Sequence, residues 1–170
     1  MPLVPFTAGQ KLTAAELNAA FDIDRTVYQA ADQTVTNSVT LVSSTSLTMP
    51  VEANATYAYD ALVIYTAPTA QDFRYKWLLP TGSGIRNSPW NNTLTDTTLN
   101  APVAHDAFDV FESAAGGIGA GAMVTYRPGG VMIVGATSGS MTFQFAQWTA
   151  GAATSAVLKL GSWVRLARVA

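Results

Sequence analysis

The sequence predicts a mainly β protein: an antiparallel β-sandwich, jelly-roll-like, preceded by an extended N-terminal arm and one short α-helix. Three observations support this fold class. The apolar residues change from a helical to a strand period near Gln33, alternating apolar and polar runs then recur, and Gly-, Pro-, Ser- and Asn-rich turns separate the runs. With 170 residues the chain has the usual size of one domain. We expect residues 1–31 to form a docking arm and helix, and residues 32–170 to form the sandwich.

The N-terminal arm is extended and apolar. Pro2 and Pro5 favour an extended backbone, and Leu3, Val4 and Phe6 are its apolar residues. Because a free segment of this kind is poorly ordered, we expect it to dock on another surface.

A helix is predicted directly after the arm. Thr13 and Glu16 have the spacing of a capping box, and Leu12 and Leu17 have that of a hydrophobic staple. An apolar stripe continues to the residues before Asp32. One short helix is marginal alone, so the stripe must pack on its own β-domain or on copies from neighbouring chains. The predicted docking residues of arm and helix are Leu3, Val4, Phe6, Leu12, Leu17, Phe21 and Tyr28.

The first strands alternate most clearly. Short strands are predicted around residues 39–42 and 47–51. Residues 56–65 place tyrosines on one side, and residues 73–79 place Phe73, Tyr75 and Trp77 on one side with charges on the other. Because a short turn with Pro68 joins the last two runs, we expect a hairpin over residues 56–79.

The rest of the chain is predicted as shorter strands and connections. Residues 81–92 have loop composition, and residues 93–105 include a short edge strand. The following segments are a strand near 107–113, a flexible connector at 114–121, three strands over 122–149 with turns at 127–130 and 137–140, and one or two strands interrupted at Gly161.

Composition favours assembly with other subunits. Charged residues make up 12% of the chain and hydrophobic residues 49%, with a net charge of −2. Either much of the surface is buried against partners, or Thr, Ser, Asn and Gln cover it. We favour the first and expect a homo-oligomer, with a homotrimer as the leading form. Nine scattered Lys and Arg argue against nucleic acid. We expect no membrane insertion, because no apolar run approaches the ~18 residues of a span, and no secretion signal is recognised.

We find no combination of residues in the sequence that is typical of an active centre. There is no Cys, and His105 is the only His. Asp106 and Asp109 are too close to His105 in sequence to orient its ring as in a catalytic triad. Asp106, Asp109 and Glu112 are interleaved with apolar residues and lack calcium-loop spacing. The Gly-rich residues 116–121 lack the spacing of a phosphate loop. We therefore expect no enzyme activity, no catalytic residues, no cofactor and no metal.

One tryptophan indicates a possible ligand contact. Trp77, Trp148 and Trp163 occur in or beside strand patterns, which favours structural positions. Trp90 instead lies in the polar loop, in a group formed by Arg86, Asn87, Trp90 and Asn91. An exposed indole flanked by amides and Arg is suited to a glycan or a protein surface. The alternative is a loop anchor packed on its own or a neighbouring subunit.

Three stretches carry a resemblance to a known class of proteins. Residues 6–21, FTAGQKLTAAELNAAF, resemble the N-terminal segment of small structural proteins of tailed bacteriophages, especially those of actinobacteria. Residues 32–65 and 161–170 are similar to the same proteins, whereas residues 81–121 show no match. The resemblance implies a virion component, often of minor tail type, made in the cytoplasm of the host bacterium and without enzymatic activity.

Taken with the composition, the resemblance predicts a virion structural protein. It would attach to the particle through its N-terminal arm, associate with copies of itself and bind other virion proteins. Two alternatives stay open: a capsid decoration protein, and a receptor- or glycan-binding module displayed on the virion.

Overall fold

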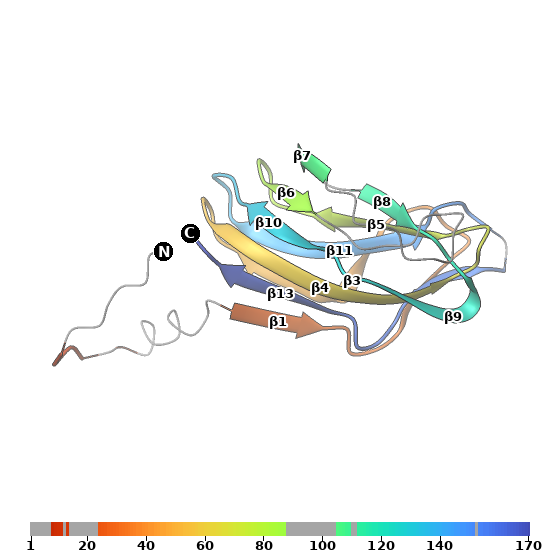
Figure 1. Ribbon diagram of the computed structural model, residues 1–170, viewed down its shortest axis with the longest axis horizontal. Helices are drawn as coiled ribbons and strands as arrows, with labels where there is room; N and C mark the ends of the chain where they lie inside the picture. Colours follow the sequence, from red (N-terminus) through yellow and green to blue (C-terminus); the bar gives the residue numbers. More distant parts are fainter. Residues whose placement is uncertain (1–7, 12, 14–23, 88–104, 110–111, 152) are drawn as a thin grey trace.

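The computed structural model describes residues 8–11, 13, 24–87, 105–109, 112–151 and 153–170, and in this part the chain is all β. The strands form two antiparallel sheets that face each other (Figure 1). The larger sheet contains β1 (Asp24–Tyr28), β2 (Gln33–Thr36), β4 (Thr56–Ala67), β6 (Gly84–Asn87), β7 (His105–Asp109), β9 (Gly119–Tyr126), β10 (Gly129–Ile133), β12 (Ser155–Leu158) and β13 (Trp163–Arg168). The smaller sheet contains β3 (Val42–Val51), β5 (Phe73–Leu78), β8 (Glu112–Ala115) and β11 (Gly139–Gln147). The predicted antiparallel sandwich is confirmed.

Strand β4 is central to the larger sheet, because it pairs with β9, β10, β12 and β13. Strands β10 and β9 pair with its first and second halves in one unbroken register, from Gly129 opposite Asp60 to Tyr126 opposite Val63. The turn predicted at residues 127–130 is therefore wrong. Pro128 has no N–H to donate, but its carbonyl accepts a 2.9 Å hydrogen bond from Ala61 N, so the chain continues along β4 without reversing.

The opposite edge of β4 pairs with β13 and β12, and these pair in turn with β1 and β2. The predicted break at Gly161 is confirmed, because this glycine has φ +84° in the turn between β12 and β13.

The predicted helix is corrected where the structure describes it. Residues 24–28 form strand β1, with Tyr28 opposite Trp163 of β13. The apolar stripe expected to be helical through Tyr28 thus ends in a strand, because five residues pair with a partner strand from the far end of the chain. Between residues 14 and 23 the prediction lies outside the described residues.

The hairpin predicted over residues 56–79 is also wrong. Strands β4 and β5 alternate as expected, but they belong to different sheets, and the turn between them carries the chain across the sandwich. Alternation of side chains specifies which face is buried; it does not specify the neighbouring strand.

Strand order follows from repeated crossings between the sheets. The smaller sheet has the order β3-β11-β5-β8, and within the larger sheet β4, β10, β6 and β7 are adjacent in that order. The strand predicted near 107–113 is two strands, β7 and β8, which lie in different sheets. The connector predicted at 114–121 contributes residues to β8 and β9.

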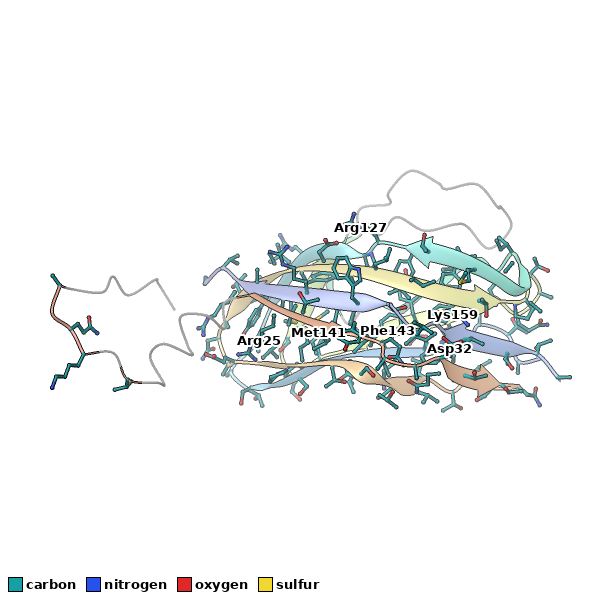
Figure 2. All side chains as sticks on the ribbon, turned by 90° about the horizontal axis from the view of Figure 1, so that it is seen from below. Arg25, Asp32, Arg127, Met141, Phe143 and Lys159 are labelled. Carbon is teal, nitrogen blue, oxygen red and sulfur yellow. The ribbon has the colours of Figure 1, made fainter. Side chains whose placement is uncertain are left out.

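The core between the sheets is rich in aromatic rings. Tyr65 stacks on Phe73 with ring centroids 4.4 Å apart, and Trp77 meets Phe143 edge-on at 5.1 Å. Figure 2 shows Phe143 and Met141 between the two layers. The first contact joins β4 to β5 across the sandwich, and the second joins β5 to β11. The alternating residues of β4 and β5 that were predicted to share one side are buried in this core.

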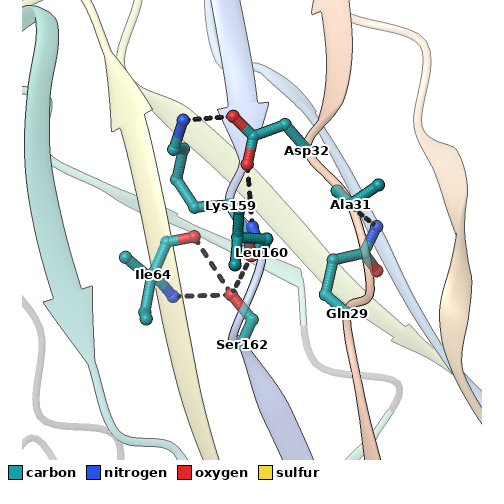
Figure 3. A network of polar contacts seen from close by, with 7 residues as sticks. All are labelled: Gln29, Ala31, Asp32, Ile64, Lys159, Leu160 and Ser162. Atoms are coloured by element: carbon teal, nitrogen blue, oxygen red, sulfur yellow. Dashed lines mark hydrogen bonds and ion pairs between the residues drawn. The ribbon is translucent and has the colours of Figure 1, made fainter.

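A polar network fixes the β12–β13 turn (Figure 3). The buried Ser162 Oγ accepts from Ile64 N at 2.9 Å and lies 2.9 Å from the Lys159 carbonyl, to which it donates. Asp32 accepts from Leu160 N at 2.8 Å and pairs with the Lys159 ammonium. Hydrogen bonds from Lys159 and Leu160 hold the pKa of Asp32 below its ordinary value.

Candidate functional site

The outer face of the larger sheet is the main candidate for an interaction surface. The odd-numbered residues of β4 from Tyr57 to Tyr65 are buried in the core, so its even-numbered residues point outward. Register places outward residues of β1, β13, β9 and β10 beside them. We call this set the apolar face: Tyr28, Ala58, Leu62, Ile64, Met123, Val131, Ile133, Trp163 and Ala167.

Several members of the apolar face are strongly exposed. Tyr28 is 67% exposed, Met123 64%, Ile133 41% and Val131 40%. The others are partly buried by their neighbours in the sheet. Clusters of exposed apolar residues are typical of interaction sites, whereas single exposed apolar residues are ordinary.

A charged row divides the apolar face in two. Asp60 lies opposite Arg165 in β13, and its Oδ2 is 2.8 Å from Arg127 Nη2. The Arg127 guanidinium also lies 6.0 Å from the centre of the Trp163 ring. The Arg127–Asp60 pair is exposed and so adds little to stability. The pair matters for the surface because its charges separate the part of the apolar face that contains Tyr28 from the part that contains Val131.

The outer face of the smaller sheet has a different character. Thr48 Oγ1 donates to Thr142 Oγ1 at 3.2 Å, and Gln144 Nε2 donates to Ser43 Oγ at 3.1 Å. Beside them, Arg74 Nε donates to a Glu112 carboxylate oxygen at 2.8 Å. The outer face of the smaller sheet is therefore mainly polar, with Leu78 exposed at 45%, whereas the larger sheet presents more apolar side chains, interrupted by Asp60, Arg127 and Arg165.

The predicted docking residues are described in one case. Tyr28 lies on the edge strand β1 and belongs to the apolar face. The other six, which precede β1, lie outside the described residues: Leu3, Val4, Phe6, Leu12, Leu17 and Phe21.

The predicted ligand group is described in part. Arg86 is exposed on β6, and Asn87 ends that strand opposite His105 of β7. Asn87 and His105, which flank residues 88–104 in the sequence, are therefore paired neighbours in the sheet. Trp90 and Asn91 fall within that segment, outside the described residues.

Sequence reasoning missed most of the apolar face. Only the alternation in β4 gave a signal for Ala58, Leu62 and Ile64, since no local pattern shows that β10 and β13 flank them. It also misjudged Trp148, which is 44% exposed at the end of β11, with the Arg74 guanidinium 5.9 Å from its ring centre.

Chemical candidates are few in the described part of the chain. No group of three His, Asp or Glu there is placed to hold a metal ion. His105 begins strand β7. The buried Ser162 hydroxyl is bonded to backbone groups and holds a turn. In the same part, no helix is long and apolar enough to cross a membrane.

Asp72 is the buried carboxyl group of the sandwich. Its Oδ1 accepts a 2.8 Å hydrogen bond from Gly117 N. Burial raises the pKa of Asp72, and the hydrogen bond from Gly117 partly opposes that shift. Gly117 is required here, because a Cβ on it would lie 2.4 Å from the Ala67 carbonyl oxygen. This contact joins the β4–β5 turn to the β8–β9 connection.

Comparisons give only distant structural similarity. No family model and no curated protein matches the chain. A structure of infectious bursal disease virus, Gx strain, is similar over 85% of this chain and 33% of that chain, with 10% identity and a TM-score of 0.40. The VP2 subviral particle of infectious bursal disease virus is similar over 86% and 37%, with 10% identity and a TM-score of 0.19. The chain spans about a third of the length of these proteins of virus particles, and similarity at this level does not indicate a function.

Proposed function

We propose that the chain is a non-enzymatic structural protein of a virus particle that assembles with copies of itself, with a homotrimer as the leading form. The observation that carries this proposal is the contrast between the two sheets. The larger sheet has a more apolar outer face, and the smaller sheet has a more polar, hydrogen-bonded one. This arrangement suits a subunit with one side buried against other subunits and the other side exposed to water.

Two further features support a virion component. The strand orders β3-β11-β5-β8 and β4-β10-β6-β7 are those of two interlocked Greek keys, as in a jelly roll, a fold used by viral capsid domains and by lectins. The N-terminal segment resembles small structural proteins of tailed bacteriophages. We propose a tail-associated location with attachment through residues 1–31, whose described strand β1 pairs with β13.

The test of this function has two measurements. Native mass spectrometry of the full chain is expected to show a homo-oligomer. Deletion of residues 1–12 is expected to leave the strand signal in circular dichroism unchanged and to prevent incorporation into particles during infection. A stable monomer that binds no virion protein, or normal incorporation of the deleted chain, would contradict the proposal.

Location is a separate measurement. Gold labelling of the chain on intact particles, viewed by electron microscopy, distinguishes a tail protein from the alternative, a capsid decoration protein.

A second candidate function is receptor or glycan binding by the group formed by Arg86, Asn87, Trp90 and Asn91. The observation that favours it is that Arg86 is exposed on β6, one residue before the pair formed by Asn87 and His105. Replacing Trp90 with Ala is then expected to lower binding to host cells at least tenfold without changing the fold. Trp148→Ala is a matched control, because it removes another exposed indole from a different surface. Equal binding by both variants would remove this candidate.

A further inference from the structure

A shallow apolar track crosses the larger sheet at the end where the chain enters it. Asp24, the first residue of β1, lies opposite Ala167 of β13. Ala167 lies opposite Ala58 of β4, and Ala58 lies opposite Val131 of β10. We call Ala167, Ala58 and Val131 the alanine track. Because two of its three side chains are single methyl groups, another chain can approach the sheet closely along it.

Larger side chains border the alanine track. On one side lies the row containing Arg165 and Asp60, and on the other lies Ile133, which is opposite Thr56. Val131 and Ile133 are 40% and 41% exposed. The track is therefore a strip of three apolar residues, with charge beside it at Arg165 and Asp60 and at its end in exposed Arg86, which lies opposite Val131. Such a strip suits an extended segment with apolar side chains.

The described part of the N-terminal segment does not cover its own track. Residues 8–11 and 13 are exposed to solvent, and Figure 1 shows residues 8–11 standing clear of both sheets. Apart from Gly9 and its two chain neighbours, no heavy atom of the described residues lies within 4 Å of the position that a Cβ would take on Gly9.

The length of the segment allows it to reach another copy. At about 3.5 Å per extended residue, residues 1–23 span up to about 80 Å. The five strands from β1 to β6 are crossed in about 20 Å at about 4.8 Å per spacing. The segment also carries apolar residues that need a partner surface: Leu3, Val4, Phe6, Leu12, Leu17 and Phe21.

We propose that residues 1–23 of one copy pack across the alanine track of a second copy. This inference rests on the proposed self-assembly and names the two surfaces that produce it. The apolar arm covers Val131 and Ile133, and the exchange of arms links the subunits.

The first experiment locates the arm. Phe6 is replaced by the photoreactive analogue p-benzoylphenylalanine, and full-length chains labelled with nitrogen-14 and nitrogen-15 are assembled together. Irradiation is expected to link the arm peptide to peptides of β4, β10 or β13, with mixed isotopes in the linked pair. Links between peptides of one isotope only would place the arm on its own sheet and overturn the inference.

The second experiment tests the receiving surface in the full chain. Val131→Asp is expected to weaken self-association at least tenfold and to abolish the mixed-isotope links. Val42→Asp is the matched control, because Val42 is equally exposed, at 40%, but lies on β3 of the smaller sheet. Circular dichroism checks that both variants keep their strands.

The results separate this inference from the proposed function. A wild-type monomer would contradict self-assembly itself. A wild-type oligomer whose links map to other strands, or that responds equally to Val131→Asp and Val42→Asp, would overturn the arm-to-track contact and leave the proposed function standing.

Discussion

Asp72 shows how one residue joins two connections of the sandwich. It has φ +48°, its backbone N–H donates to the Pro68 carbonyl at 2.9 Å, and its carboxyl accepts from Gly117. Asp and Asn tolerate this left-handed conformation better than most residues. The geometry needs a short side chain with an acceptor oxygen, and it does not need the charge.

This distinction leads to a prediction for Asp72→Asn. Burial raises the folded-state pKa, so the folded protein holds the proton more tightly than the unfolded chain, whose Asp titrates at about 3.9. Stability is therefore lost as the pH rises from that value through the folded pKa. Asp72→Asn is expected to remove this pH dependence and to raise the free energy of unfolding at pH 7, measured by urea unfolding across pH.

Asp72→Ala is the control for the acceptor. It loses the hydrogen bond and leaves Gly117 N–H unpaired, so we expect a loss of about 1–2 kcal/mol. Equal losses in the Asn and Ala variants would show that the charge itself stabilises the fold.

At the scale of elements, pairing with distant strands determined the secondary structure of two segments whose local sequence favours a helix or a turn. Residues 24–28 continue an apolar stripe with helical spacing, yet they form β1 because β13 provides an antiparallel partner. Likewise Gly129 and Gly130, which suggest a turn, lie in β10 between β4 and β6. In both cases hydrogen bonds to a distant strand outweigh a local preference of a few tenths to about 1 kcal/mol per residue.

Other elements were predictable because their signal is local. In β5 the alternation of Phe73, Tyr75 and Trp77 with Arg74 and Lys76 gave the buried face correctly. For the candidate site, a helical stripe predicted Tyr28 as a docking residue, whereas the structure places Tyr28 on strand β1. The row formed by Ala167, Ala58 and Val131 could not be predicted from the sequence, because its members are far apart along the chain.

At the scale of the whole molecule, the buried tyrosines make the stability of the fold depend on pH in the alkaline range. Burial raises the pKa of Tyr59, Tyr65 and Tyr126 above the ordinary range. The Tyr126 hydroxyl lies in the core without a hydrogen-bond partner in the described structure. Ionising any of these phenols would place a charge between the sheets, so the folded state keeps them protonated.

We therefore predict that these three tyrosines ionise only on unfolding. Above pH ~10 the unfolded chain loses phenol protons that the folded chain retains, so stability falls as the pH rises, by up to ~1.4 kcal/mol per pH unit for each tyrosine. Phenolate absorbance and circular dichroism, recorded together, are expected to show the ionisation of these tyrosines coinciding with unfolding. Tyr126→Phe is expected to reduce the slope by about a third. Ionisation of all three in a protein that keeps its strands would contradict the prediction.

The sequence by itself determined that the fold is mainly β, the buried sets of the clearest strands and the scarcity of catalytic groups, because side-chain alternation and composition are local properties. The tertiary structure decided which strands are neighbours, that β4 and β5 lie in different sheets, and that the outer face of the larger sheet gathers more apolar residues than that of the smaller sheet. The physical reason is that a strand's hydrogen bonds are made to other strands. In β4 the partners come from residues 119–133 and 155–168, which no local pattern connects to residues 56–67.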